Sequence, residues 1–160
     1  ETSPSGKLTD TIAKSVGDYP SDANFGDPDR NYYAEDIYVG YRYFETFQKD
    51  AVQFPFGFGL SYSEFKTEFV SLDKTDDGFT LKCKVTNIGS VSSRYAPQVY
   101  VEKPCGAIGN PYRELGAFAK TKLLAPCESE KLTLTVPLRA FASYDEEGAV
   151  EGLPESRRLV

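Results

Sequence analysis

The sequence predicts an all-β fold, an antiparallel β-sandwich of immunoglobulin-like type that follows an irregular N-terminal extension. Two observations support this prediction. From about residue 65 onward, apolar and polar residues alternate with a period of two, as in a sheet with one buried face and one face in water. The alternating runs also recur at a regular spacing and are separated by turn residues, which is typical of sandwiches.

The clearest strand is expected at residues 79–87, where Phe79, Leu81, Cys83 and Val85 alternate with polar residues. Asp76-Asp77-Gly78 before it predicts a hairpin-like turn. The chain has no Trp, which excludes the Cys-Trp-Cys signature of true immunoglobulin domains, so we expect a fibronectin type III-like sandwich over about residues 63–148. The expected strands lie near residues 66–73, 79–87, 96–103, 114–121 and 130–138, with a short sixth strand near 141–145.

The first 62 residues are expected to be mostly irregular. Residues 1–31 are rich in Pro, Gly, Ser, Asp and Asn, which indicates extended and turn-rich chain. Leu8, Ile12 and Val16 recur every four residues and are compatible with a short helix over 7–16, which at that length depends on tertiary packing. Residues 149–160 at the other end are expected to form a tail or linker.

Composition excludes several classes of partner. The net charge is −6, the isoelectric point is about 4.8, and the basic residues are scattered, which argues against binding to nucleic acid. No apolar run is long enough to cross a membrane, and the first residues lack the apolar core of a signal peptide. The chain has no Met, so we expect it to be part of a longer protein, and we expect a cytoplasmic location.

The three cysteines do not form a metal or redox motif. None stands in a C-x-x-C arrangement, so zinc-binding and thioredoxin-like interpretations fail. Cys83 lies on the apolar face of an expected strand and is predicted to be a small core residue. A disulfide between Cys105 and Cys127, both in expected loops, stays open, although the composition fits a reducing compartment slightly better.

No metal or cofactor site is expected elsewhere in the chain. Asp27, Asp29 and Asn31 have the spacing that opens a calcium loop, but Tyr32 replaces the glycine at the sixth position. Tyr38 replaces the glutamate at the twelfth position, so a calcium site is not expected. The absence of His removes His-dependent triads and most metal sites.

The aromatic run from Tyr32 to Tyr62 has three interpretations. Its rings can pack in a junction between domains, which suits Tyr because its hydroxyl needs a wet or hydrogen-bonded end. They can instead form a platform on which sugars stack, or a surface for self-association. We favour the packed junction. Gly40, Gly57 and Gly59 are expected to permit positive φ angles or close backbone approach between the rings.

The run from Tyr32 to Thr46, closed by Phe54 to Tyr62, resembles the junction motif of family 3 glycoside hydrolases of the β-glucosidase type. In that family, the motif joins the second, sandwich-like catalytic domain to a fibronectin type III-like domain. The resemblance extends over about residues 4–148 and is specific because its motifs follow in the family's order. They are Pro4 to Thr9, Val85 to Gly89 (V-T-N-x-G), Val99 to Val101, Arg113 to Lys120, Leu123 to Ser129 and Ala142 to Asp145.

The resemblance implies a C-terminal, non-catalytic region of a longer enzyme. Residues 1–62 would be the junction segment, 63–148 the fibronectin type III-like domain, and 149–160 the tail or linker. The parent enzyme would hydrolyse terminal non-reducing β-D-glucosyl residues without a cofactor, and its catalytic domains would pack on the Tyr32 to Tyr62 aromatics. The isolated fragment could also self-associate. A carbohydrate-binding module and a protein-interaction module remain the alternatives.

No catalytic residue is predicted in this chain. Retaining hydrolysis needs two carboxyl groups about 5–5.5 Å apart. Glu35 and Asp36 are adjacent and would point to opposite sides of an extended stretch, so they could not flank one bond. Glu114 lies in an expected strand without a partner carboxylate. We therefore expect the chain alone to be inactive.

Two departures from the family pattern have structural consequences. Cys127 replaces the glycine of the family's L-x-P-G-E-S turn, which predicts a strained or differently shaped turn. The final strand of the family, with a W-x-x-x-x-G-x-Y-like pattern, is not found after Asp145, which would leave an open sheet edge.

Overall fold

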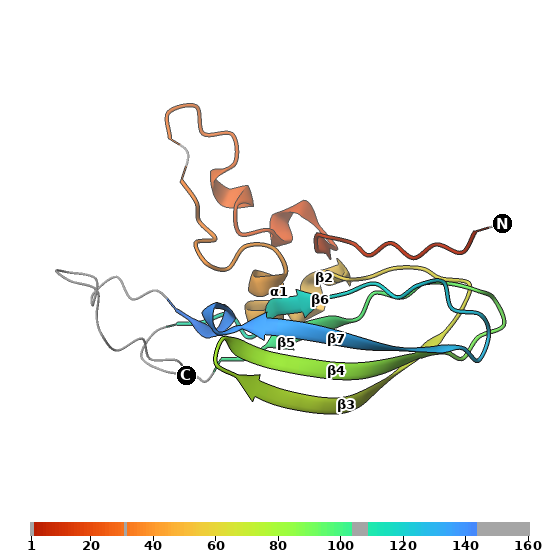
Figure 1. The fold of residues 1–160 in the computed structure, drawn as a ribbon. Helices are drawn as coiled ribbons and strands as arrows, with labels where there is room; N and C mark the ends of the chain where they lie inside the picture. Colours follow the sequence, from red (N-terminus) through yellow and green to blue (C-terminus); the bar gives the residue numbers. More distant parts are fainter. Residues whose placement is uncertain (1, 31, 104–108, 144–160) are drawn as a thin grey trace.

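The computed structural model of the chain describes residues 2–30, 32–103 and 109–143. Its largest sheet is antiparallel, with the strand order β3-β4-β7, and consists of β3 (Phe65–Thr75), β4 (Gly78–Asn87) and β7 (Ser129–Pro137). Strands β5 (Gln98–Val101) and β6 (Glu114–Phe118) form a second antiparallel sheet. The expected all-β, fibronectin type III-like architecture is confirmed (Figure 1).

The core lies between the two sheets. The alternation in β4 turns Cys83 and Val85 inward, where they pack with Leu134 of β7 and Leu124 of the loop before it. All four are at most 3% exposed. Cys83 is therefore a core residue as predicted, and burial raises the pKa of its thiol. Partly buried residues complete the cluster: Phe65, Leu81, Tyr95, Val99, Ala117, Ala119 and Leu132.

The five long strands are confirmed, with ends that differ from the expected ones by a few residues. The sixth strand expected near 141–145 is wrong in its described part. A 3-10 helix (Leu138–Phe141) follows β7 instead, because Leu138 N–H donates to Asp77 O and the Phe141 ring packs on Phe79 at 5.2 Å. Residues 144 and 145 and the expected tail at 149–160 lie outside the described residues.

The extension contains more regular structure than expected. Strands β1 (Ile12–Ala13) and β2 (Val52–Phe54) pair antiparallel, and α1 covers Tyr41–Phe47. Three 3-10 helices lie at Val16–Asp18, Asp22–Asn24 and Lys49–Ala51.

The short helix considered over residues 7–16 is absent. Leu8 instead exchanges backbone hydrogen bonds with the segment after β2, donating to Phe58 O at 2.7 Å and accepting from Gly57 N–H at 2.8 Å. A ten-residue helix has little stability by itself in water. The extended conformation, which pairs with a distant segment, is therefore more stable here.

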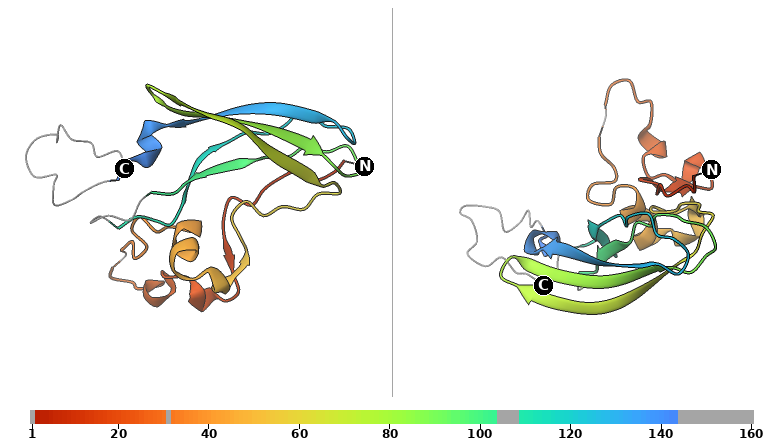
Figure 2. Two further views of the ribbon diagram at one scale, coloured as in Figure 1. Left: turned by 90° about the horizontal axis from the view of Figure 1, so that it is seen from below. Right: turned by 45° about the vertical axis from the view of Figure 1, so that its right-hand side comes forward.

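The extension forms a third layer. Both sets of views place α1 and β2 against the β5-β6 sheet, on the side away from β3 and β4 (Figures 1 and 2). The described residues on both sides of residue 31, from about 20 to 30 and from 32 to 40, project from this layer away from the sandwich. In the part of the chain that the structure describes, no helix is long and apolar enough to cross a membrane.

Candidate interdomain interface

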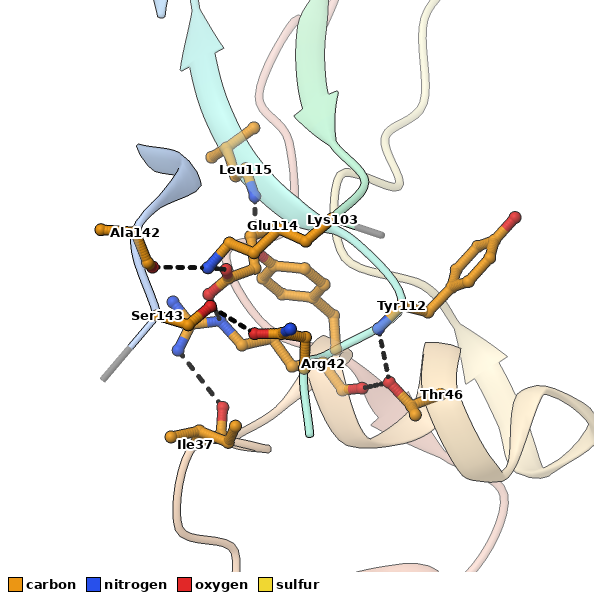
Figure 3. Close-up of polar contacts among 11 residues, drawn as sticks. Ile37, Arg42, Thr46, Lys103, Tyr112, Glu114, Leu115, Ala142 and Ser143 are labelled. Carbon is orange, nitrogen blue, oxygen red and sulfur yellow. Dashed lines mark hydrogen bonds and ion pairs between the residues drawn. The ribbon is translucent and has the colours of Figure 1, made fainter. Parts of the chain in front are cut away.

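Helix α1 is fixed to the sandwich by side chains that bind backbone amides near the start of β6. Leu115 N–H donates to the Tyr41 hydroxyl at 2.7 Å, and Tyr112 N–H donates to Thr46 Oγ1 at 2.9 Å (Figure 3). The Thr46 hydroxyl in turn donates to Arg42 O at 2.6 Å. Because these partners are more than 60 positions apart, the contacts join the extension to the sandwich as one structure.

Glu114 links three segments through ion pairs. Lys103 Nζ lies 2.6 Å from its carboxylate, and Arg42 Nε lies 3.4 Å from it. Lys103 also donates to Ala142 O at 2.8 Å, and Arg42 donates to Ile37 O at 3.5 Å (Figure 3). The Lys103 side chain is only 7% exposed, so its ammonium group has lost most of its contact with water. The Glu114 carboxylate offsets that loss. Glu114 therefore holds α1, the segment after β5 and the start of β6 together.

Aromatic rings pack beside these ion pairs. The Tyr41 ring lies 4.6 Å from Phe56 and 6.0 Å, edge-on, from Tyr100 of β5. Arg113 lies over the Tyr100 ring at 4.9 Å and pairs with Glu45 of α1 at 2.6 Å. Burial raises the pKa of the Tyr100 hydroxyl. This part of the aromatic run packs against the sandwich, as the junction interpretation requires.

A second contact lies at the other end of the sandwich. Ser93 Oγ donates to Ser3 Oγ at 2.9 Å, and Tyr62 N–H donates to the same Ser3 oxygen at 3.1 Å. Ser3 and Ser93 are 8% and 1% exposed. Ser3 is thus held against the start of the fibronectin-like domain.

The aromatic run divides into a buried part and an exposed part. Phe44 is 1% exposed and packs edge-on against Tyr19 and Tyr43. Other apolar side chains of the extension remain in water, with Tyr33 at 91% and Phe25 at 89% exposure. We call the exposed members between residues 25 and 62 the exposed apolar set: Phe25, Tyr32, Tyr33, Ile37, Val39, Phe47, Phe54, Leu60 and Tyr62. Exposed aromatic rings such as these bury a large area when they pack on a further surface.

The three glycines of the run have the roles expected of them. Gly40 and Gly57 have φ angles of 61° and 80°, in the left-handed region. Gly59 lies so close to Gly6 that a Cβ atom on it would be 2.4 Å from the Gly6 carbonyl oxygen.

The other acidic candidates are not brought together into a site. Residues 34–37 form a turn in which Asp36 has a φ of 49°, so the assumed extended stretch at Glu35 and Asp36 is wrong. Tyr38 N–H donates to Glu35 O at 2.8 Å and closes this turn.

The calcium-like spacing also has a local structural explanation. Asp27 Oδ1 accepts from the backbone N–H groups of Asp29 and Arg30 at 2.9 and 3.2 Å, an Asx-type turn. Asn31 lies outside the described residues. Among the residues that are described, no group of three or more acidic or Cys side chains could hold a metal ion.

The family turn V-T-N-x-G contains a buried side chain whose role the sequence did not indicate. Asn87 is 0% exposed, and its Oδ1 accepts from Ser63 Oγ at 2.5 Å and Gly89 N–H at 3.0 Å. Its Nδ2 donates to Val91 O at 2.8 Å and Leu124 O at 2.9 Å. One amide therefore connects the start of β3, the end of β4 and the loop before β7.

The strain predicted at Cys127 is confirmed. Cys127 has a φ of 64°, in the region that favours glycine, and its N–H donates to Asn87 O at 2.9 Å. The thiol is exposed and free, while Cys105, the other cysteine considered for a disulfide, lies outside the described residues.

Comparison with known proteins agrees with this architecture. Residues 95–152 match the fibronectin type III-like domain family. A β-glucosidase of Ruminococcus albus is 53% identical over 148 residues, which are 92% of this chain and 16% of that protein. The chain thus spans about a sixth of the length of this relative.

Solved structures of β-glucosidases contain the same fold. The enzyme from Paenibacillus barengoltzii superposes with a TM-score of 0.86 at 55% identity, over 91% of this chain and 16% of that one. The family 3 β-glucosidase of Bifidobacterium adolescentis gives a TM-score of 0.81 at 37% identity, over 92% and 22% of the two chains. In sequence and in fold, the chain is homologous to the fibronectin type III-like domain region of family 3 β-glucosidases.

Proposed function

We propose that the chain is a non-catalytic, structural region of a β-glucosidase-like enzyme that braces the catalytic domains of the longer protein. The observation that carries the proposal is an extension that is fixed to the sandwich and still leaves apolar side chains in water. Helix α1 is held against the sandwich through Tyr41, Thr46 and Glu45, while the members of the exposed apolar set remain exposed. Exposed rings on a rigidly held segment provide a surface on which a second domain can pack.

The proposal assigns the chemistry to the rest of the parent protein. The parent reaction is hydrolysis of terminal non-reducing β-D-glucosyl residues, with two carboxyl groups that this chain does not supply. Glu114, one of the acidic candidates, is held by Lys103 and Arg42. Sugar specificity then belongs to the catalytic domains, and the chain affects activity only through their stability and arrangement.

The exposed free thiol of Cys127 favours a reducing, cytoplasmic location as part of this proposal. Alkylation in intact cells followed by mass spectrometry should find Cys127 as a free thiol. An oxidised Cys127 would contradict the location and leave the structural role untouched.

A substitution at Tyr33 tests the structural role. The side chain is 91% exposed, so Tyr33→Ser should leave the thermal stability of the isolated chain unchanged. In the parent enzyme, the same change should lower the melting temperature because it removes a ring that packs on a catalytic domain. Phe69→Ser is the matched control, since Phe69 is 68% exposed on β3, away from the extension. An equal effect of Tyr33→Ser in both proteins would contradict the role.

Assays of the isolated chain separate the alternatives. It should not hydrolyse a chromogenic β-glucoside, and its tyrosine fluorescence should not change on titration with cellobiose or laminarin. A saturable change with either sugar would instead support a carbohydrate-binding module.

A further inference from the structure

A basic cavity lies where the extension, the second sheet and the end of β7 meet. It has a volume of about 610 Å³, within the range of small-molecule sites. Its described lining comes from four segments of the chain and consists of Arg42, Lys103, Glu114, Leu115, Pro137, Arg139, Ala140 and Ala142. The close-up in Figure 3 shows the Arg42, Lys103 and Glu114 side chains of this wall converging.

The charges of the lining do not balance. Three cationic side chains face a single carboxylate, which gives the described lining a net charge of +2 in a chain whose net charge is −6. Glu114 is shared by Lys103 at 2.6 Å and Arg42 at 3.4 Å. Arg139 lines the same cavity and, among the described residues, its guanidinium makes no ion pair or hydrogen bond. One cation is therefore matched within the lining, and the positive excess is open to a ligand.

Donor groups in the cavity also exceed the acceptors. Arg42 Nε is buried and makes no hydrogen bond among the described residues, although it lies 3.4 Å from the Glu114 carboxylate. Lys103 uses two of its three N–H groups, on Glu114 and on Ala142 O. Arginine and lysine donors around a partly enclosed space are suited to oxyanions, since guanidinium groups bind carboxylate and phosphate with two parallel hydrogen bonds.

We propose that this cavity binds a small oxyanion, either a carboxylate or a phosphate. The charged wall of Arg42, Lys103 and Arg139 supplies the donors, and Glu114 keeps the first two in place. The remaining wall of Leu115, Pro137, Ala140 and Ala142 is apolar and can contact the carbon skeleton of an organic acid such as a sugar acid. The site is independent of the packing proposed for the exposed apolar set, so either proposal can fail alone.

The test is an NMR titration of the whole 160-residue chain. The ionic strength is held constant, so that the screening of charges by salt stays the same throughout. Inorganic phosphate, glucuronate and glucose are added separately, and the backbone amides of Leu115, Arg139 and Ala142 are followed. Saturable shifts with phosphate alone identify an inorganic anion site, and shifts with glucuronate alone identify an organic acid site. Glucose is the neutral partner of glucuronate and should cause no shift. Absence of a saturable shift with either anion, or equal shifts with glucose, would overturn the proposal.

Variants of Arg139 test the assignment without threatening the fold, because this side chain is exposed. Arg139→Gln should weaken anion binding about tenfold, the effect of losing one charge-assisted contact. Arg139→Lys keeps the charge and should stay within about threefold of the original affinity. Arg30→Gln removes the same charge from the exposed projecting segment and should leave binding unchanged. Equal weakening by Arg139→Gln and Arg30→Gln would show that only the net charge matters and would contradict a site.

Discussion

Cys127 occupies a backbone position that suits glycine better than any residue with a side chain. Its φ of 64° costs an L-residue about 1 kcal/mol or more, whereas glycine adopts this conformation freely. Cys127→Gly should therefore stabilise the chain by about 1 kcal/mol, less a part lost to the greater freedom of glycine in the unfolded state. Urea unfolding monitored by circular dichroism measures the change.

Cys127→Ala is the control for this substitution. It removes the same thiol but keeps a Cβ atom in the left-handed conformation, so it should not stabilise the chain. Equal stabilities of the Gly and Ala variants would mean that the thiol, and not the backbone, determines the effect.

Asn87 should be among the most sensitive polar residues of the chain. Asn87→Ala removes all four side-chain hydrogen bonds and leaves the carbonyl groups of Val91 and Leu124 without this donor. We expect a loss of about 3 kcal/mol or more in the free energy of unfolding. The comparison is Ser63→Ala, which removes only one of these bonds and should cost about 1 kcal/mol. Similar losses for the two variants would contradict a network centred on Asn87.

At the scale of elements, the hydroxyl of Tyr41 connects α1 to β6. Tyr41→Phe keeps the ring against Phe56 and Tyr100 but leaves Leu115 N–H without its partner. We expect a loss of about 1–2 kcal/mol in stability and faster hydrogen exchange at the Leu115 amide. Tyr43→Phe is the matched control, since the Tyr43 hydroxyl makes no hydrogen bond among the described residues. If Leu115 exchanges at an unchanged rate in Tyr41→Phe, the hydroxyl does not hold the two elements together.

The elements of the sandwich could be predicted because their physical cause is local. A period of two in residues 79–87 and 130–138 identifies a strand with one buried face wherever its partners lie. The extension has no such pattern. Helix α1 is seven residues long, and its stability depends on contacts with residues 112–115, which lie more than 60 positions away.

The candidate sites could be predicted from the sequence even less well than the structure of the extension. Arg42, Lys103 and Glu114 come from three separate segments, and their convergence follows only from the tertiary packing. The aromatic run did predict a packed junction. It could not indicate that Tyr41 and Phe44 are enclosed within the chain while Tyr33 remains exposed, because that division depends on how the extension folds back on the sandwich.

At the scale of the whole molecule, the sandwich and the extension are joined into one structure. Its two sheets and the extension share a continuous set of contacts, from Ser3 at one end to Glu114 and Ala142 at the other. The relatives are several times longer than this chain, and the exposed apolar set is a part of the extension that the chain leaves uncovered. Covering those rings would remove a large apolar area from water and so hold neighbouring domains in place.

Hydroxyl-radical footprinting of the isolated chain and of the intact parent enzyme is the most direct test of this account. Phe25, Tyr32 and Tyr33 should react readily in the chain and be strongly protected in the enzyme. Phe69 on β3, which has a comparable exposure, should react equally in both. If the three rings of the extension are as reactive in the enzyme as in the isolated chain, they do not pack on the catalytic domains and the proposed bracing role is wrong.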